Sequence, residues 1–589
     1  MYVLTKIKPQ LLFLLLLLLA LSYGLVGFDR ASNHGTYIPY AIRMVDDTFL
    51  VNDWWMENTT HYHKSFFYLV YPFVGDHLKT YLALLNFLVI AGGLAALLYL
   101  FRDEDHGAAL FITLLFLLKC LQPKVTLGVS YIFSAGLQPS SIGAAFTLWG
   151  IVFFLKRQWL YSGIAIALSG VFHANFVVAA FPIFGFAHIL AGHHHLTSRL
   201  LKQLAPSLIV IAAWLPIVLG MGEGQEAFKE EAYAVFKSAV ALHYDFASYS
   251  HYAWGFAGWT LVSVLAWYRL AHQGGKSGSA ATPTDQPMGQ GTYFSLLDIS
   301  TYQGRFAVLF LAFLAAMVTN GLILAALDIE FINRLFMWRM APFALLLGLV
   351  PITQCLVDLI KADNPAPRPG LLGSILLLLA IGLIYIDFLD GWKGKVVWLA
   401  FAFSAAVFLA LTYQSLLAQP VKKAIQTATP AALCVLLLAV SLYQFSDPKK
   451  HSLLLSDFQQ TDVELYDWAR ATPPGTVFMA PPSMADFQIE TGRALPLTWK
   501  ALPFVAEETV EWAERMRILT GSSSFSSAQD LDDAYARQPL SKLRAAAQFF
   551  KADFAIFIKG TEAAELFTEK LFENDTYIVV STDTILEDR

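Results

Sequence analysis

Acidic side chains gather in one polar stretch near the start of the chain, residues 29–79, which separates two strongly apolar segments. It contains Asp29, Asp46, Asp47 and Asp53, together with several histidines. A carboxylate can remove the proton from an acceptor hydroxyl during group transfer and so act as a general base. We expect Asp47 or Asp53 to have this role, with Asp29 or Asp46 as the alternative.

Two tryptophans directly follow the last of these acids. Trp54 and Trp55 come straight after Asp53, and indole rings both stack on sugars and settle at the interface between membrane and water. An alternative interpretation is a solvated loop with an interfacial aromatic belt, in which the acids have no chemical role. We favour function because so many acids and histidines, His34 among them, lie close together in the sequence.

Positive charge is needed to stabilise a departing phosphate in such a transfer. Arg334 and Arg339 lie at the start of a later apolar segment, where a charge is costly unless it has a partner. A guanidinium binds phosphate through two parallel hydrogen bonds, so we expect these arginines to bind a substrate phosphate. Snorkelling of both side chains to lipid headgroups is the alternative.

Further polar residues occur in two other places. His243, Tyr244 and Asp245 follow a predicted amphipathic helix over residues 226–240, and His173 lies at the end of another apolar run. Histidines and carboxylates that converge can bind a metal ion or a phosphate. Their spacing matches no helical metal motif such as H-E-x-x-H, so a divalent metal ion stays an open question and single interfacial histidines are the alternative.

The composition is typical of a membrane protein. Hydrophobic residues make up 56% of the chain, charged residues make up 14%, and the mean hydropathy is +0.53. Apolar runs near the ~20 residues that cross a bilayer recur about thirteen times, which predicts a polytopic α-helical protein. No small-residue cleavage site follows the first run, so we expect an uncleaved helix rather than a signal peptide.

The distribution of Lys and Arg in the short loops predicts the orientation. With the N-terminus in the cytoplasm, the loops on that side receive most of the basic residues. The stretch 29–79 and the tail after residue 445 then both lie outside the cytoplasmic membrane. The three cysteines fall in or beside apolar runs, so we expect no disulfide framework.

Two domains are expected, a transmembrane domain over residues 1–445 and an extracytoplasmic soluble α/β domain over residues 446–589. In the tail, short segments rich in β-branched and aromatic residues alternate with helical stretches, which favours one small sheet covered by helices. The expected strands are 476–482, 494–499, 553–558 and 576–582, and the expected helices are 462–470, 507–519, 528–537 and 540–550.

The many apolar runs, the acidic first outer loop and the soluble tail on the same side resemble the GT-C superfamily of membrane glycosyltransferases. The chain is more closely similar to a bacterial set of GT-C-like proteins whose first loop has an H…P…R…D…D pattern, seen here as His34, Pro39, Arg43, Asp47 and Asp53. The resemblance implies a GT-C-like fold and adds Arg43 to the substrate-binding residues. It also implies a sugar donor linked to polyprenyl phosphate and a saccharide, lipid or protein acceptor.

A second motif of that set is only partly present. Its P-H-H-Y-D sequence is reduced here to the LHYD that ends at Asp245, with Ala241 and Leu242 in place of the proline and the first histidine. The tail carries the matching arginine as Arg493. We expect His243, with Arg334, to contact the donor phosphate. GT-C enzymes work with or without a divalent metal, so the metal requirement stays open.

Three other functions compete with glycosyl transfer. A secondary transporter would place ionisable residues near the middle of the membrane and often show paired repeats, and the sequence shows neither. A polymerase or ligase of surface polysaccharide usually lacks a long soluble tail, and a non-catalytic scaffold would tolerate the loss of Asp47. The net charge of -5 and the scattered basic pairs argue against nucleic-acid binding.

Overall fold

The computed structural model describes residues 9–26, 34–101, 136–191, 196–241, 302–327, 336–361 and 460–586, with parts of 132–134, 256–267, 329–333 and 434–438. The described chain is mostly helical, with one small sheet near its C-terminal end. Three described helices are long and apolar enough to cross a membrane, Leu78–Leu100, Ser198–Gly222 and Gly304–Gly321. These helices do not support about thirteen spans, and the runs expected at 108–121, 371–388 and 396–417 lie outside the described residues.

The membrane-type helices form a bundle whose members follow the predicted apolar runs. They are α1 (Pro9–Ala20) with the π-helical η1 (Leu21–Val26), α5 (Leu78–Leu100), α7 (Pro139–Leu155), α8 (Trp159–Phe172), α9 (Ala174–Leu190), α10 (Leu196–Gly222), α14 (Tyr302–Ala326), the 3-10 turn η7 (Met337–Met340) and α16 (Ala341–Lys361). Helices suit this setting because they satisfy every backbone hydrogen bond within one segment.

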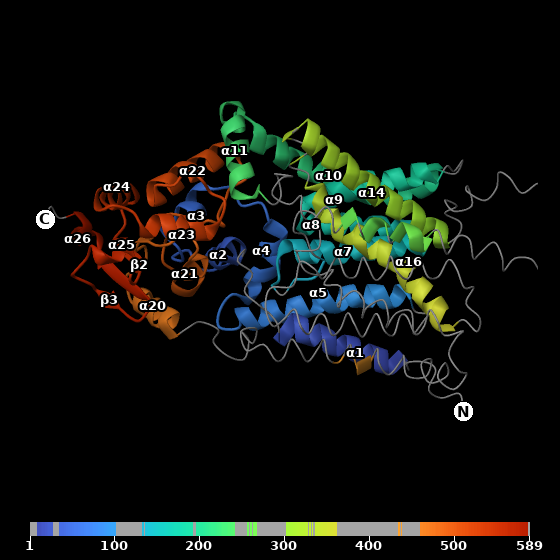
Figure 1. Cartoon of the computed structure of the whole chain (residues 1–589), viewed down its shortest axis with the longest axis horizontal. Helices are drawn as coiled ribbons and strands as arrows, with labels where there is room; N and C mark the ends of the chain where they lie inside the picture. The colour runs from blue at the N-terminus through green and yellow to red at the C-terminus, as the bar shows by residue number, and fades with distance from the viewer. Residues whose placement is uncertain are drawn as a thin grey trace, which may run out of the picture.

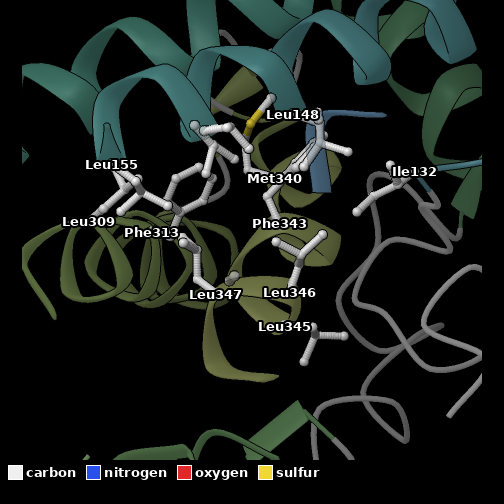
Figure 2. Packing of buried hydrophobic residues seen from close by; sticks show 14 of the residues in the cluster. Ile132, Leu148, Leu155, Leu309, Phe313, Met340, Phe343, Leu345, Leu346 and Leu347 are labelled. Atoms are coloured by element: carbon white, nitrogen blue, oxygen red, sulfur yellow. The ribbon is translucent and has the colours of Figure 1, made fainter. Parts of the chain in front are cut away.

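An apolar core joins α7, α14 and α16. Figure 2 shows side chains of these helices packed together, among them Leu148 and Leu155 of α7, Leu309 and Phe313 of α14 and Phe343 of α16. Each of the five is 0% exposed. Such close van der Waals packing holds membrane helices together, since lipid tails are as apolar as leucine.

The polar stretch near the start of the chain folds into short helices, although we expected a loop. These are α2 (His34–Arg43), α3 (Trp54–Asn58), α4 (Lys64–Val70) and the 3-10 turn η2 (Tyr71–Phe73). Helices this short are marginal alone, and tertiary packing stabilises them: Ile38 of α2 belongs to one buried cluster with Phe66 and Phe67 of α4. Leu50 and Asn52 take positive φ angles of 53° and 67° in the turn before α3.

The C-terminal unit is a four-stranded sheet with helices around it. Its helices are α20 (Gln460–Arg470), α21 (Ala485–Thr491), α22 (Ala506–Thr520), α23 (Ala528–Ala536), α24 (Leu540–Phe550), α25 (Glu562–Glu565) and α26 (Thr582–Leu586), and its strands are β1 (Phe478–Met479), β2 (Phe554–Ile558), β3 (Phe572–Glu573) and β4 (Tyr577–Ser581). The strand order is β1-β2-β4-β3. β1 runs parallel to β2, and the other neighbours are antiparallel.

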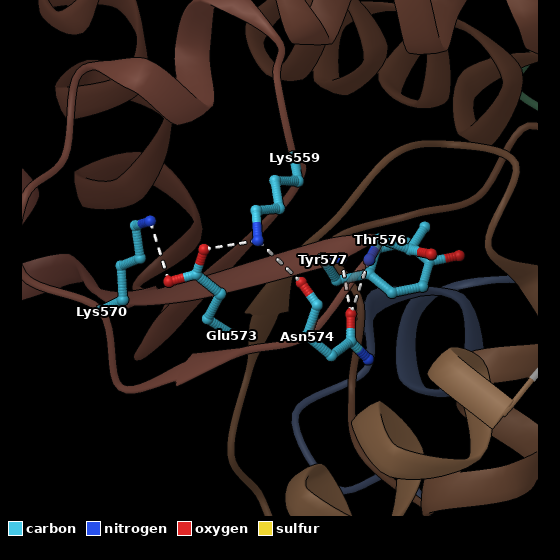
Figure 3. Close-up of polar contacts among 6 residues, drawn as sticks. All are labelled: Lys559, Lys570, Glu573, Asn574, Thr576 and Tyr577. Atoms are coloured by element: carbon cyan, nitrogen blue, oxygen red, sulfur yellow. Dashed lines mark hydrogen bonds and ion pairs between the residues drawn. The ribbon is translucent and has the colours of Figure 1, made fainter.

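Polar contacts close the hairpin between β3 and β4 (Figure 3). Glu573 pairs with Lys559 at 2.8 Å and with Lys570 at 3.0 Å. The side chain of Asn574 accepts a hydrogen bond from the backbone N–H of Tyr577 at 2.8 Å and so orders the turn. The ion pairs are solvent-exposed, so each contributes little to stability.

Most of the elements predicted for the tail are confirmed, with one clear error. The four predicted helices correspond to α20, α22, α23 and α24, and the strands at 553–558 and 576–582 correspond to β2 and β4. The strand expected at 494–499 is wrong, because only a single bridge joins Val477 to Ala494. Pro496 has no N–H, and the N–H of Leu495 donates to Asp53 instead of to a neighbouring strand.

The C-terminal unit lies against one end of the bundle, where α2 meets α21 and α22 meets α11 (Lys229–Ala239) (Figure 1). With the preceding turn η5 (Glu226–Phe228), α11 confirms the amphipathic helix predicted at 226–240. Trp54 Nε1 donates to Glu511 at 2.7 Å, and the N–H of Phe525 donates to Ser238 at 3.1 Å. The polar stretch and the tail, far apart in sequence, therefore meet.

Candidate functional site

A cleft lies where the polar stretch, α11, η7 and the C-terminal unit come together. It holds about 960 Å³, part of which is open to solvent. Its lining includes Trp55 and His61 from the polar stretch, Arg339 from η7, and Trp499 and Lys500 from the C-terminal unit. The other lining residues are Thr36, Tyr37, Thr60, Tyr62, His63, Phe67, Phe236, Ala239, Val240, Phe336, Leu502 and Phe504.

The charge in this cleft is one-sided. Arg339 and Lys500 are its cations, and its described lining includes no Asp or Glu. Aromatic rings form much of the wall, and Tyr62 packs edge to face on Phe504 with the ring centres 4.9 Å apart. Cations beside aromatic surface suit an anionic ligand that also has an apolar or ring-shaped part.

Three buried polar atoms of the lining have no hydrogen-bond partner within the described structure, Trp55 Nε1, His61 Nε2 and Arg339 Nε. Buried polar groups nearly always have a partner, and those that lack one in protein contact usually meet a water or a ligand. All three atoms belong to residues that line one cleft.

His61 is a neutral base in this cleft at pH 7. Burial lowers the pKa of His61 to about 4, against the opposing effect of hydrogen bonds to the backbone of Met56 and Trp55. Those bonds need a ring N–H, so the unpartnered Nε2 is the nitrogen with the free lone pair. It can accept a proton or a hydrogen bond from a ligand hydroxyl.

A pair of imidazoles, His63 and His173, lies beside Arg339. The ring centres of His63 and His173 are 5.3 Å apart. Burial, followed by the charge of Arg339, lowers the pKa of His63 to about 3. The Arg339 guanidinium lies over the ring of Phe336, 5.4 Å from its centre. Because His63 is neutral, it adds no second positive charge beside the guanidinium. The described lining contains no carboxylate that could pair with Arg339.

Asp53 lies next to the cleft but does not line it. It is 0% exposed and caps α3, where its carboxylate accepts from the N–H of Met56 at 3.1 Å. The same carboxylate accepts from the Gln488 side chain and from the N–H of Leu495, so it ties α3 to the C-terminal unit. Burial raises the pKa of Asp53 to about 6, and these hydrogen bonds act in the opposite direction.

The other predicted residues of the polar stretch lie apart from the cleft lining. Asp46 and Asp47 are exposed in the turn after α2, and hydrogen bonds from Thr48 lower the pKa of Asp46. Arg43 donates to the carbonyl of Phe49 at 2.6 Å. His34 is buried, and its Nε2 lies 2.7 Å from the carbonyl of Leu137. Their observed contacts are local or structural.

Several predicted site residues lie outside the described residues: Asp29, His243, Tyr244, Asp245 and Arg334. Arg493 is described, and its guanidinium donates to carbonyls at the end of α20, including that of Thr472 at 3.1 Å. Within the described part of the chain, no group of three or more His, Cys, Asp or Glu could hold a metal ion.

The sequence did not predict that residues of the C-terminal unit would line the cleft. Trp499 and Lys500 stand in a segment that we expected to be a strand and its end, without any motif around them. Trp499 Nε1 donates to the carbonyl of Phe525 at 3.0 Å, and Lys500 Nζ lies 4.4 Å from the centre of the Trp499 ring. Burial lowers the pKa of Lys500. Only the docking of the tail reveals that these residues face Arg339 and His61 across one space.

One family model matches the chain. It is described as a domain of unknown function, DUF6798, and it covers residues 460–519. This region runs from α20 to α22 and includes the Trp499 and Lys500 wall of the cleft. No curated protein matches the chain.

Proposed function

We propose that the chain is an integral-membrane glycosyltransferase that uses a polyprenyl-phosphate-linked sugar as its donor. The acceptor would be a saccharide, lipid or protein on the outer face of the cytoplasmic membrane. The observation that carries the proposal is Arg339, whose buried Nε lacks a partner in an aromatic cleft without a described carboxylate. The apolar helices support a membrane location. We propose that the whole chain crosses the membrane about thirteen times.

The donor phosphate would bind Arg339. A guanidinium stabilises the negative charge that develops on a departing phosphate, and it does so best where water is scarce. The indole N–H of Trp55 is a second donor without a partner in the described structure. The sugar ring would then pack on the aromatic wall that Tyr62 and Phe504 form.

The transfer itself needs a proton acceptor. An acceptor hydroxyl attacks the anomeric carbon, the bond from that carbon to the phosphate oxygen breaks, and the hydroxyl proton passes to a base. In the described lining, His61 Nε2 is a basic nitrogen without a hydrogen-bond partner. It would act as the general base, the role that we expected of Asp47 or Asp53. Asp53 would act as a positioning residue, because it caps the helix that carries Trp55.

The position of the cleft favours transfer over transport. Its lining comes from the outer stretch, α11, η7 and the C-terminal unit rather than from the middle of the long apolar helices. A transporter would bind its substrate near the middle of the membrane, between broken helices.

Binding of polyprenyl phosphate to the full chain in lipid nanodiscs tests this proposal. Arg339→Ala should weaken binding at least about tenfold, because it removes a charge-assisted contact. Arg537→Ala is the matched control, since Arg537 is an exposed arginine of the C-terminal unit. Equal affinity of the wild type and Arg339→Ala would refute the phosphate site.

Turnover tests the reaction. Nanodisc samples incubated with a panel of polyprenyl-phosphate hexoses should release free polyprenyl phosphate, and His61→Gln should slow the release more than it weakens binding. The same assay with and without EDTA decides the metal requirement. Tight binding of polyprenyl phosphate without turnover of any donor, also with added glycans or lipids, would contradict the transferase assignment.

A further inference from the structure

Lys500 is a cation without a counter-ion in the described structure. Its side chain is partly buried in the wall of the cleft, and its ammonium contacts the ring of Trp499. No ion pair or hydrogen bond joins Lys500 Nζ to another described side chain. A partly desolvated charge is costly unless it has a partner, so the missing partner points to a ligand.

Two acidic residues of the C-terminal unit already have partners. On α22, Glu508 accepts hydrogen bonds from the side chain and the backbone N–H of Thr60, at 2.7 and 3.1 Å. Glu511 accepts from Trp54 and pairs with Arg515 at 2.8 Å. Their contacts with Trp54 and Thr60 hold α22 on the polar stretch, and Lys500 is a partner in none of them.

The indole of Trp499 makes Lys500 part of a built site. The hydrogen bond from Trp499 Nε1 to the carbonyl of Phe525 fixes the ring, and the ring then positions the ammonium through a cation–π contact. Arg339 lies on the wall formed by the bundle and Lys500 on the wall formed by the C-terminal unit. The cleft therefore offers one cation on each wall.

We propose that Lys500 forms a second anion subsite, distinct from the phosphate site at Arg339, which binds a phosphate or carboxylate group of the bound substrates. This inference rests on the proposed function, since it assumes that the donor phosphate occupies Arg339. The group has two chemical sources. It is either the second phosphate of a diphosphate carrier or the acidic group of an anionic acceptor saccharide.

Binding assays with defined probes separate the two sources. The full chain in nanodiscs is titrated with polyprenyl monophosphate, with polyprenyl diphosphate, and with an oligogalacturonate after saturation with the monophosphate. The variants are Lys500→Gln and Lys500→Arg, and the matched control is Lys542→Gln, at an exposed lysine of the same unit. Lys500→Arg keeps the charge and should retain most of the binding.

If the subsite takes a second phosphate, Lys500→Gln weakens diphosphate binding about tenfold and leaves monophosphate binding unchanged. If it takes an acceptor group, Lys500→Gln weakens oligogalacturonate binding about tenfold and changes neither lipid. Unchanged binding of all three probes would overturn the subsite. Lys500-dependent anion binding without sugar transfer from any donor would instead remove the transferase proposal and leave the subsite standing.

Discussion

A single buried carboxylate, that of Asp53, holds the polar stretch to the C-terminal unit. Asp53→Asn keeps an oxygen for the cap of α3 but brings an amide N–H towards the N–H of Leu495. An unsatisfied buried donor costs about 1–3 kcal/mol, so thermal unfolding in detergent should shift down. Asp46→Asn is the control, because Asp46 is exposed and its partner Thr48 is local. Equal shifts in unfolding temperature for both variants would show that the hydrogen bonds of Asp53 do not stabilise the protein more than an exposed local contact does.

The same carboxylate predicts a dependence of stability on pH. Its pKa in the folded protein is about 6 against an ordinary value of 3.8. The folded state therefore holds the proton more tightly, so this contribution is full below pH 3.8 and is lost as pH rises through 6, in all about 3 kcal/mol. The difference in unfolding free energy between Asp53→Asn and wild type should change across that window and stay constant above pH 7.

His61 produces the opposite dependence. Its folded pKa of about 4 lies below the ordinary 6.5, so its contribution is full above pH 6.5 and is lost as pH falls towards 4. The slope from this group is at most about 1.4 kcal/mol per pH unit. His61→Gln should flatten the acid side of the stability profile measured by thermal unfolding. A profile that keeps its slope in the variant would place the proton uptake elsewhere.

At the scale of elements, the polar stretch and the tail pack against each other where α2 meets α21. A Cβ added at Gly35 would lie 2.7 Å from the Cβ of Ala485, which is too close for two carbon atoms. Gly35→Ala should therefore separate the two helices, although alanine favours a helix by up to about 1 kcal/mol over glycine. Faster hydrogen exchange in α21 is the expected result.

The double variant Gly35→Ala/Ala485→Gly makes this prediction specific, because it moves the methyl group from one helix to the other. It should restore slow exchange in α21. Gly220→Ala is a neutral control, since no atom lies within 4 Å of its added Cβ. Rapid exchange that persists in the double variant would show that the backbone change, and not the steric contact, loosens the interface.

The elements also show what the sequence could predict. Alternating strands and helices follow from local periodicity, so α22 and β4 were predicted close to their observed bounds. The short helices α2, α3 and α4 were not predicted, because packing against distant segments stabilises them more than their own helix propensity does. Lys500 was missed for the same reason: its importance depends on a wall formed by residues hundreds of positions away.

At the scale of the whole molecule, the cleft exists only while the C-terminal unit is docked on the bundle. Two kinds of contact cross that interface. Two are ion pairs with an exposed cation, Lys79 with Glu490 at 3.8 Å and Arg517 with Glu231 at 3.4 Å. The others are hydrogen bonds, exposed ones such as that of Thr60 to Glu508 and the buried ones of Asp53, together with apolar packing. Exposed pairs contribute about 0–1 kcal/mol each and are screened by salt.

Docking should therefore survive high salt. A bifunctional maleimide should link Thr60→Cys to Glu508→Cys in a cysteine-free background, since the two native side chains lie 2.7 Å apart. The yield in 1 M NaCl should stay close to that in 50 mM, because screening removes only the weak ion pairs. Asp53→Ala should lower the yield at both salt concentrations, as it removes the buried link. A yield that collapses in high salt alone would mean that surface charge, and not the buried carboxylate, holds the two walls of the cleft together.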